Sequence, residues 1–525
     1  MTQVLIVEDE EILARNIATA LRRAGVEVAV AGSCSAARSE IASSPPDLVI
    51  ADVNLGDGDG IDLLADWRQD HPDVPVVVMT GQDSLSNRLR AERLDATAFL
   101  SKPFAMRRLR ELILILLAEG NPGLGPGIRG PSVMMYSHDT IGLGHMRRNA
   151  SIASALIERF PNASVLMMVG CPAGMVFELK PGIDFVKLPS LTKLGRNQWR
   201  PSSLRVSPDT TRSIRMGILE RAAEAFRPDI LLVDHEPAGV WEELVPTLKA
   251  IRLRGGASVI LGLRDILDDP KRTRALWDKQ GTAQVVRDLY DGVFVYGDQR
   301  VFPSSDHYGL EMLQPDNVTY CGYVTTAHRG SNRDRKNAIP RRILVSGGGG
   351  RDAYPVLSAS LEALACIHPE RRPEMTLIAG PLMDEELRAP LSARAKQLDA
   401  EFLDSTSDMP ALLDAADLLV TMGGYNSVTE AIAACCPTIV IPRIGPSSEQ
   451  RLRAECLERF GLVETVSQEA LDPEVLAKRF RRYDGSRTPM IEVPLNGAVM
   501  AANLIAERLA TIRPDTPKDA RSAHG

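Results

Sequence analysis

A segment rich in glycine and proline divides the chain. Eight of the twelve residues from Gly120 to Pro131 are Gly or Pro, and neither a helical nor a strand period persists through such a run. Before it, short apolar runs alternate with amphipathic stretches, which is typical of a parallel sheet with helices on both faces. The alternation resumes at residue 132 and starts again after an arginine-rich stretch at 329–342. We therefore predict an α/β protein with a first domain at 1–119, a linker at 120–131, two further lobes at 132–335 and 336–512, and a disordered tail at 513–525.

The composition narrows the function classes. The 525 residues are 44% hydrophobic and 25% charged, as in an ordinary globular protein. Because 61 Lys and Arg face 68 Asp and Glu, we expect no nucleic-acid partner. The apolar run at 112–118 is far shorter than the roughly 20 residues that cross a bilayer, we see no signal-peptide pattern, and the cysteines lack C-x-x-C spacing. These features predict a cytoplasmic protein.

Polar residues follow four apolar runs of the first domain, namely Glu8 and Asp9, Asp52, Thr80, and Lys102. The carboxyl ends of parallel strands meet at one edge of a sheet, so we expect these side chains to lie together. Three carboxylates in one crevice repel each other and need a hard cation. We predict Mg²⁺ held by Asp9, Asp52 and the backbone carbonyl of Asn54, with Glu8 binding through water.

Asp52 is then the natural nucleophile toward a phosphoryl group. Lys102 would neutralise the added charge, and the Thr80 hydroxyl would turn toward a phosphoryl oxygen. The segments that carry these residues resemble the receiver domain of two-component response regulators, in the right order and at the right strand ends: Val7–Glu10, Ile50–Val53, Met79–Gly81 and Leu100–Pro103.

That resemblance implies a flavodoxin-like (β/α)5 fold and a partner that is a sensor histidine kinase or a phosphotransfer protein. It also implies that Phe99 is the family's rotating switch aromatic, although a buried strand Phe needs no such role. The bond before Pro103 is expected to be cis.

Two strand–loop–helix units in the last lobe are candidates for binding phosphate. The first, Ile343–Asp352, carries Gly347, Gly348 and Gly349, where backbone N–H groups can approach a phosphate or a lobe interface. The second, Leu418–Ala431, is predicted to place four residues at a helix N-terminus, which suits a diphosphate; they are Gly423, Gly424, Asn426 and Ser427.

Glu430, in the same unit, can accept bonds from ribose hydroxyls. A capping-box partnership with Ser427 is the alternative. The continuation Glu430–Pro437, Ile439–Pro442 and Glu449-Gln450 resembles the C-terminal half of MurG-like GT-B glycosyltransferases.

This second resemblance implies a GT-B pair of Rossmann-like lobes. It assigns Glu430 to the ribose, 423–427 to the diphosphate and Gln450 to the sugar hydroxyls, while Glu449 stands where the family has Gln. Helix N-termini and backbone donors would stabilise the leaving diphosphate, so no metal is required in this cleft; the Asp57-Gly-Asp59 motif belongs to the first domain.

The lobe at 132–335, called the front lobe from here on, is expected to supply the catalytic base. Gly142–His145 resembles the N-terminal glycine-rich turn of the same family, which ends in His, so His145 could take the proton from an acceptor hydroxyl. His138 and Asp139, a pair that MurG lacks, are further candidates. A third cluster follows another predicted strand, Asp234, His235 and Glu236. These residues are expected to be acceptor-side or supporting residues, and a solvated turn is the alternative.

Six basic residues lie in a stretch with only one acid, Asp209; they are Lys193, Arg196, Arg200, Arg205, Arg212 and Arg215. One hypothesis is that this loop receives an anionic acceptor or leans on anionic lipid headgroups at the inner membrane face. A merely solvated loop is the alternative.

Together, these features predict a glycosyltransferase in which phosphorylation of Asp52 controls transfer from a nucleotide sugar, expected to be UDP-linked, to an unknown hydroxyl acceptor. The switch could act through lobe closure or homodimerisation. Two alternatives remain open: a nucleotide-sugar 2-epimerase, which needs no acceptor, and a non-catalytic nucleotide-sugar sensor.

Overall fold

The computed structural model divides into two compact units, residues 1–129 and 130–525. The structure describes residues 3–72, 74–81, 87, 90–91, 94, 96–104, 106–119, 130–137, 144–171, 179–195, 198–325, 339–406, 408–445, 447–481 and 489–512. The predicted linker and tail therefore lie almost entirely outside the described residues, as does the joint predicted near 335. In the described parts of the chain, no helix combines the length and the apolar character needed to cross a bilayer.

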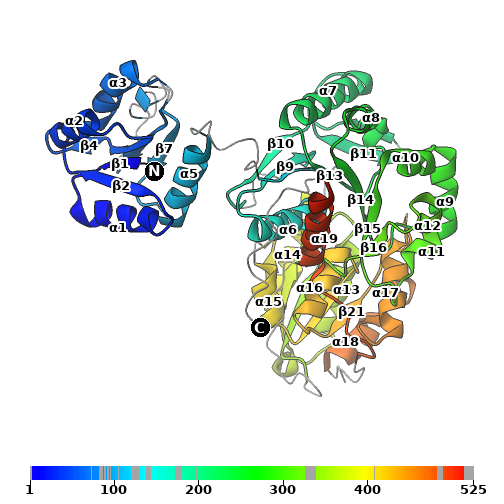
Figure 1. Ribbon diagram of the computed structural model, residues 1–525. Helices are drawn as coiled ribbons and strands as arrows, with labels where there is room; N and C mark the ends of the chain where they lie inside the picture. Colours follow the sequence, from blue (N-terminus) through cyan, green and yellow to red (C-terminus); the bar gives the residue numbers. More distant parts are fainter. Residues whose placement is uncertain are drawn as a thin grey trace, which may run out of the picture. The chain divides into compact units, whose positions relative to one another are not determined.

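The first unit is built on a parallel five-stranded sheet in the order β2-β1-β3-β6-β7. This is the flavodoxin-like strand order, as predicted. Helices cover the sheet (Figure 1). The strands are β1 (Gln3–Val7), β2 (Glu27–Ala31), β3 (Leu48–Asp52), β6 (Val76–Thr80) and β7 (Ala98–Ser101), with a small hairpin of β4 (Asn54–Leu55) and β5 (Gly58–Asp59); the helices are α1 (Glu11–Arg22), α2 (Cys34–Ser43), α3 (Gly60–Asp70) and α5 (Met106–Glu119).

The apolar runs of this unit fall on its central strands because both faces are buried; β1, β3 and β6 are buried almost throughout. The edge strand β2 is only partly buried, with two exposed, two half-buried and one buried position. The peptide bond between Lys102 and Pro103 is cis, which confirms that expectation.

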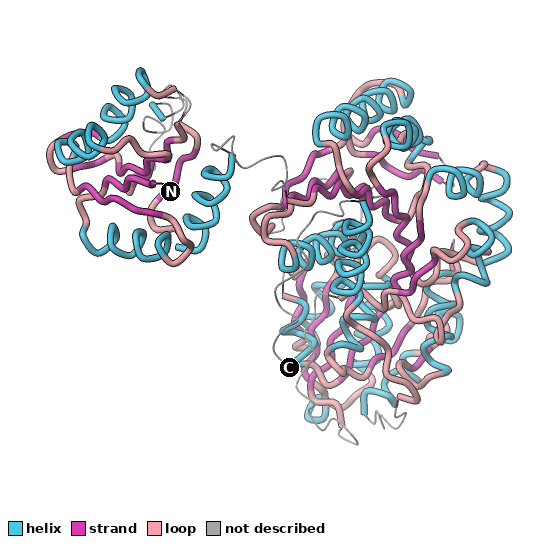
Figure 2. The backbone as a smooth tube through the Cα atoms, viewed as in Figure 1, coloured by secondary structure: helices cyan, strands magenta, loops and turns pink. Residues whose placement is uncertain are grey.

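The second unit contains two parallel sheets between layers of helices (Figure 2). The first is seven-stranded, in the order β10-β9-β8-β13-β14-β15-β16. Its strands are β8 (Ser132–Ser137), β9 (Ser164–Val169), β10 (Ile183–Lys187), β13 (Ile230–Asp234), β14 (Ser258–Arg264), β15 (Gly292–Tyr296) and β16 (Val318–Tyr320), with a separate hairpin of β11 (Leu191–Gly195) and β12 (Gln198–Pro201). Its helices are α6 (Gly144–Arg159), α7 (Pro208–Phe226), α8 (Val245–Arg254), α9 (Pro270–Lys279), α10 (Thr282–Leu289), α11 (Ser304–Tyr308) and α12 (Leu310–Leu313).

The other sheet of this unit is six-stranded, in the order β19-β18-β17-β20-β21-β22. Its strands are β17 (Arg342–Ser346), β18 (Glu374–Ile378), β19 (Glu401–Leu403), β20 (Leu418–Thr421), β21 (Thr438–Val440) and β22 (Glu464–Thr465). The helices of this lobe are α13 (Tyr354–Ala365), α14 (Glu385–Gln397), α15 (Met409–Ala415), α16 (Tyr425–Ala433), α17 (Glu449–Arg459) and α18 (Pro473–Arg481).

Both sheets reverse their strand order in the Rossmann manner, between β8 and β13 and between β17 and β20. Ligands of such folds bind at the carboxyl ends of the strands beside that reversal. The fold therefore marks the segments that follow these four strands, and the two lobes have the predicted Rossmann-like form.

The last helix, α19 (Gly497–Ile512), belongs with the first of these lobes and not with the second, in which the range 336–512 had placed it. It packs along α6 (Figure 1). Four of its apolar residues join the core cluster that contains the buried residues of α6, Ala501, Ala502, Ile505 and Leu509. An amphipathic pattern shows that a helix must bury one face, but it does not specify which lobe supplies the partner.

Candidate functional site

The four polar strand ends of the first unit meet at one edge of its sheet. Lys102 Nζ lies 2.6 Å from Glu8 Oε2 and 2.7 Å from Asp52 Oδ2, donating to both carboxylates. Burial raises the pKa of Glu8 above its ordinary value, although Lys102 acts in the opposite direction. Burial acts to lower the pKa of Lys102, but Asp52 and Glu8 outweigh it and hold that pKa above its ordinary value. Thr80 is fully buried at the end of β6.

These carboxylates fit a divalent cation. Glu8, Asp9 and Asp52 each offer an oxygen within 4.8 Å of the others. Asp52 Oδ1 is buried and has no hydrogen-bond partner among the described residues, which is costly unless something binds it. Asn54 begins β4 two residues beyond Asp52, so its backbone carbonyl is a candidate ligand as predicted. The donors are all oxygen, as Mg²⁺ prefers.

Other marked residues of this unit have structural environments of their own. Phe99 is half-buried on β7 and packs against the core. Asp57 accepts from the backbone N–H groups of Ser35 and Cys34 at the start of α2, which lower the pKa of Asp57 to about 2. Asp59 caps α3 and pairs with Arg90. The Asp57-Gly-Asp59 motif thus orders two helix N-termini.

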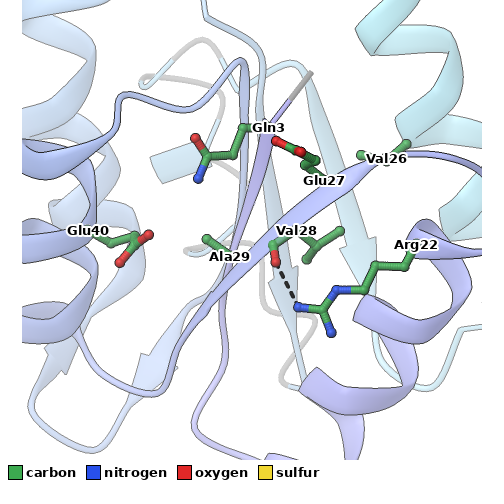
Figure 3. Close-up of a pocket in the computed structure, with 7 residues that line it drawn as sticks. All are labelled: Gln3, Arg22, Val26, Glu27, Val28, Ala29 and Glu40. Atoms are coloured by element: carbon green, nitrogen blue, oxygen red, sulfur yellow. Dashed lines mark hydrogen bonds between the residues drawn. The ribbon is translucent and has the colours of Figure 1, made fainter. Parts of the chain in front are cut away.

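A pocket of about 560 Å³ lies elsewhere on this unit (Figure 3). It is lined by residues at the start of β1 and along β2, with side chains from α1 and α2, and Arg22 donates to the carbonyl oxygen of Val28 over 2.8 Å. Because Glu8 and Asp52 stand at the carboxyl ends of β1 and β3, the pocket is at the other end of the strands from the acidic cluster.

In the second unit, the front-lobe reversal brings two residues of one helix, His145 and Arg148, to the distant Asp234. His145 lies at the start of α6, which follows β8, and Asp234 ends β13. His145 Nδ1 is 2.5 Å from Asp234 Oδ2, and Arg148, one turn along α6, donates to Asp234 Oδ1 through Nε over 3.2 Å and through Nη2. Asp234 is fully buried. Burial acts to raise the pKa of Asp234, but Arg148 and His145 outweigh it and hold that pKa well below its ordinary value.

The other front-lobe candidates are placed less fully. His138 and Asp139 lie outside the described residues. The ring of His235 is 5.2 Å from that of His145, and its backbone has a φ of 69°, a conformation that is uncommon outside glycine and recurs at functional sites. Glu236 forms a tight turn with Asp234. Asp234, predicted as an acceptor-side or supporting residue, is thus the partner of His145 in the structure.

On the second lobe, three predicted loops converge. A Cβ added to Gly348 would lie 4.0 Å from Ser427 Oγ, and one added to Gly423 would lie 4.0 Å from Gln450 Cβ. Gln450 accepts from the backbone N–H of Arg443 over 3.2 Å. The loops after β17, β20 and β21 therefore adjoin at the sheet reversal.

Part of the glycine requirement is structural. A Cβ on Gly347 would lie 2.7 Å from the Ala379 carbonyl oxygen, because the backbone after β17 crosses closely over that after β18. Gly349 has only an ordinary contact with Leu382, while Gly348 has a φ of 59°. Gly348 is thus the member of the run that combines a left-handed backbone with space above it.

Helix α16 starts at Tyr425 with Gly424 as its N-cap. Ser427 is therefore inside the helix and Glu430 is in the second turn, so the capping-box alternative is wrong. Glu430 is 3% exposed, and its Oε1 lies 3.0 Å from Arg147 Nη1 of the front lobe. Asn426 Nδ2 donates to the Gly144 carbonyl oxygen over 3.4 Å. The N-terminal turns of α6 and α16 thus face each other across the two lobes.

Glu449 is buried in a network of ion pairs that sequence reasoning missed. Its Oε1 lies 2.6 Å from Arg264 Nη1 at the end of β14 and 2.9 Å from Arg453 Nη2 on its own helix. Arg453 also pairs with Asp265 of the front lobe over 2.7 Å and donates to the Gly423 carbonyl oxygen. These arginines outweigh burial and lower the pKa of Glu449. Glu449 therefore joins the lobes, and its contact with a donor sugar stays a prediction.

The basic stretch of the front lobe is only partly exposed. Arg200 and Arg205 are exposed, whereas Arg215 is 2% exposed and forms two bonds to Glu243. Arg215 therefore does not belong to a basic surface, since its charge is neutralised inside the lobe. Arg196 and the Lys193 side chain lie outside the description.

Residues 4–114 match the sequence model of the response regulator receiver domain, and residues 342–508 match that of the glycosyltransferase family 28 C-terminal domain. The KDP operon transcriptional regulatory protein KdpE of Escherichia coli K12 is 37% identical over 126 residues, which are 24% of this chain and 56% of KdpE. The response regulator protein PilR of Pseudomonas aeruginosa is 36% identical over 120 residues, 23% of this chain and 27% of PilR. The chain thus spans about half the length, or less, of these curated relatives.

Among solved structures, the glycotransferase of kitacinnamycin has a TM-score of 0.44 and 17% identity, covering 74% of this chain and 96% of that one. By the two sequence-model matches, the chain carries a response regulator receiver domain at its N-terminus and a glycosyltransferase family 28 domain toward its C-terminus.

Proposed function

We propose that this protein is a glycosyltransferase that moves a sugar from a nucleotide-sugar donor, UDP-linked in the first instance, to a hydroxyl acceptor under the control of phosphorylation at Asp52. The observation that carries the proposal is the meeting of two helix N-termini in the second unit. One belongs to the family 28 domain and holds Glu430, and the other presents His145 bonded to buried Asp234.

In this reaction, Glu430 would accept the ribose hydroxyls and the N-terminal turn of α16 the diphosphate. His145 would donate a hydrogen bond from Nδ1–H to Asp234, and in this neutral tautomer Nε2 carries no proton. That nitrogen would take the acceptor's hydroxyl proton while the oxygen bonds to the anomeric carbon and the bond to the diphosphate breaks. The backbone N–H groups of α16 would stabilise the departing charge.

In the receiver, Asp52 would attack the phosphorus of a phosphodonor supplied by a histidine kinase or a phosphotransfer protein. Glu8, Asp9, Asp52 and Asn54 would hold Mg²⁺, which would screen the negative charge of the two reacting groups. Lys102, which already donates to Asp52, would then donate to one oxygen of the new phosphoryl group, and the Thr80 hydroxyl would donate to another.

A thermal-shift titration of the full chain with nucleotide sugars and nucleoside diphosphates tests the donor site, because a ligand that binds only the folded state stabilises it. We expect stabilisation by UDP and one UDP-sugar, lost in Glu430→Gln. His145→Gln should keep the stabilisation and lose turnover by about 100-fold or more, while exposed His368→Gln serves as the matched control.

The readouts separate the three classes of function. A transferase releases nucleoside diphosphate faster with acceptor, an epimerase interconverts donor sugars alone, and a sensor binds without turnover. If none of the nucleotide sugars and nucleoside diphosphates stabilises the protein, the proposed donor site is contradicted.

The acceptor class is part of the proposal. Exposed Arg205 lies between Leu204 and Val206, which are 46% and 43% exposed, and exposed Arg200 precedes them in the chain. This combination suits an anionic, membrane-associated acceptor. Flotation with anionic vesicles should be weakened when both arginines are changed to Gln, and unchanged flotation would contradict this acceptor class.

A further inference from the structure

We propose that Arg148 is a positioning residue for His145: it holds the Asp234 carboxylate to which the imidazole donates and offsets the charge of Asp234, and the second lobe holds it in place through Tyr425. The inference rests on the proposed function only for its meaning in catalysis. The arrangement itself is measurable without turnover.

The two oxygens of Asp234 are divided between two partners. Oδ1 accepts from Arg148 Nε and Nη2, and Oδ2 faces His145 Nδ1 at 2.5 Å. Arg148 and Asp234 are 2% and 0% exposed, so neither charge is screened by water. The guanidinium therefore determines how the carboxylate is turned toward the imidazole.

Arg148 also touches the imidazole directly, since its Nη2 lies 3.0 Å from His145 Nδ1. A guanidinium only donates. If Arg148 donated to Nδ1, the proton of the neutral ring would move to Nε2 and the base would be lost. An ionised carboxylate only accepts, so the contact with Asp234 assigns the proton to Nδ1 instead. Arg148 then places a positive charge beside the ring.

That positive charge opposes the effect of Asp234. A buried carboxylate alone would favour the imidazolium, which cannot accept a proton. The charged and titratable groups that face this cluster are Asp234 on β13, Arg148 on α6, His235 after β13, Tyr296 on β15 and Tyr425 on α16. Arg148 is the cation that contacts the imidazole, and Arg264 at the end of β14 is a second cation that interacts electrostatically with Arg148.

The second lobe contributes through Tyr425. The Arg148 guanidinium carbon lies 5.5 Å from the ring centres of both Tyr296 and Tyr425, within the range of cation–π attraction. The Tyr425 hydroxyl donates to the Tyr296 carbonyl oxygen over 3.0 Å and accepts from the Val324 N–H over 2.9 Å. The helix that would bind the diphosphate therefore supports the residue that orients the base.

Nitrogen-15 NMR of histidine-labelled full-length protein tests the proposal, with the His145 signals assigned from His145→Gln. In Arg148→Gln, the pH midpoint at which the His145 ring takes up its second proton should rise by about 1 unit or more, because the neighbouring cation is gone. The matched control is Arg147→Gln on the same helix, whose partner is Glu430 and which should shift the midpoint by less than about 0.3 unit.

An unchanged midpoint in folded Arg148→Gln would overturn the proposal, and so would equal shifts in both variants. The wild-type spectrum provides a test that does not depend on how the variants fold. It should show the neutral ring of His145 protonated at Nδ1, and a proton at Nε2 would mean that Arg148 donates to Nδ1 and would overturn the assignment. These NMR results do not depend on turnover, whereas the turnover of His145→Gln tests the proposed function separately.

Discussion

Asp52 has two carboxylate oxygens in different surroundings. Oδ2 accepts from Lys102, whereas buried Oδ1 has no hydrogen-bond partner in the described part of the chain. Glu8, which shares the same lysine, is 2% exposed. A cluster with two buried acids and one lysine lacks positive charge, and a divalent cation would supply it.

The excess of negative charge in this cluster predicts that Mg²⁺ stabilises the receiver to an extent that depends on pH. Burial raises the pKa of Glu8, so its contribution to stability is present below its ordinary pKa and is lost as the pH rises through the folded value. Without metal, the wild-type receiver should therefore lose stability relative to Glu8→Gln as the pH rises. Mg²⁺ at tenfold its dissociation constant should restore about 1.4 kcal/mol in the wild type.

Hydrogen exchange of peptides from β1 and β3 in the full chain, measured with EDTA and with Mg²⁺, checks this. The lowered pKa of Asp57 acts in the opposite sense, but between about pH 4 and pH 2, so the two effects separate. Equal Mg²⁺ protection at pH 4 and pH 8 would contradict the assigned role of Glu8.

Helix α17 joins the two lobes through buried ion pairs. It carries Glu449 and Arg453, and Arg453 is 1% exposed between Asp265 of the front lobe and the Gly423 carbonyl. Neither lobe alone satisfies these groups. A buried pair of this kind costs desolvation to form, but removing one partner leaves the other charge uncompensated.

Arg453→Met should therefore lower the free energy of unfolding of the second unit by about 3–5 kcal/mol. The matched control is Arg451→Gln on the same helix, where a 57% exposed arginine pairs with Glu455 and the loss should be about 1 kcal/mol or less. Urea unfolding of the three proteins measures both, and similar losses for the two variants would show that the buried network does not join the lobes.

At the scale of the whole molecule, the chain combines a receiver domain with a family 28 glycosyltransferase domain. A phosphoryl group on Asp52 would add about 1.5 to 2 negative charges beside Lys102. For the receiver to regulate the transferase, the phosphorylated and unphosphorylated receivers must interact differently with the second unit or with another copy of the chain.

Acetyl phosphate with Mg²⁺ should therefore label the wild type and leave Asp52→Asn unlabelled, with Asp57→Asn as the labelled control. Labelling should change the turnover number by about fivefold or more, since allosteric coupling is typically 1–3 kcal/mol. Turnover that is the same before and after full labelling would contradict regulation through Asp52, and equal labelling of Asp52→Asn would contradict the phosphorylation site.

Local patterns were sufficient for much of this molecule. The central strands of all three sheets appear as apolar runs because they are buried on both faces, and the polar residues directly after them mark the carboxyl edge. This logic led to Glu8, Asp52 and Lys102, which the structure brings within hydrogen-bond distance. It also marked Glu430 as a candidate, because glycine turns and helix starts leave a readable signature, whereas His145 followed from the resemblance to the glycosyltransferase family.

The tertiary structure alone decided the pairings between distant segments. A carboxylate at a strand end has the same local sequence whether it faces solvent, an arginine or a histidine, so Asp234 could not be matched to His145, nor Glu449 to Arg264. The same holds for α19. Its apolar face could pack on either lobe, and only the path of the chain back to α6 decides between them. Side chains that depend on such long-range contacts carry no local period, and packing of the two lobes determines their partners.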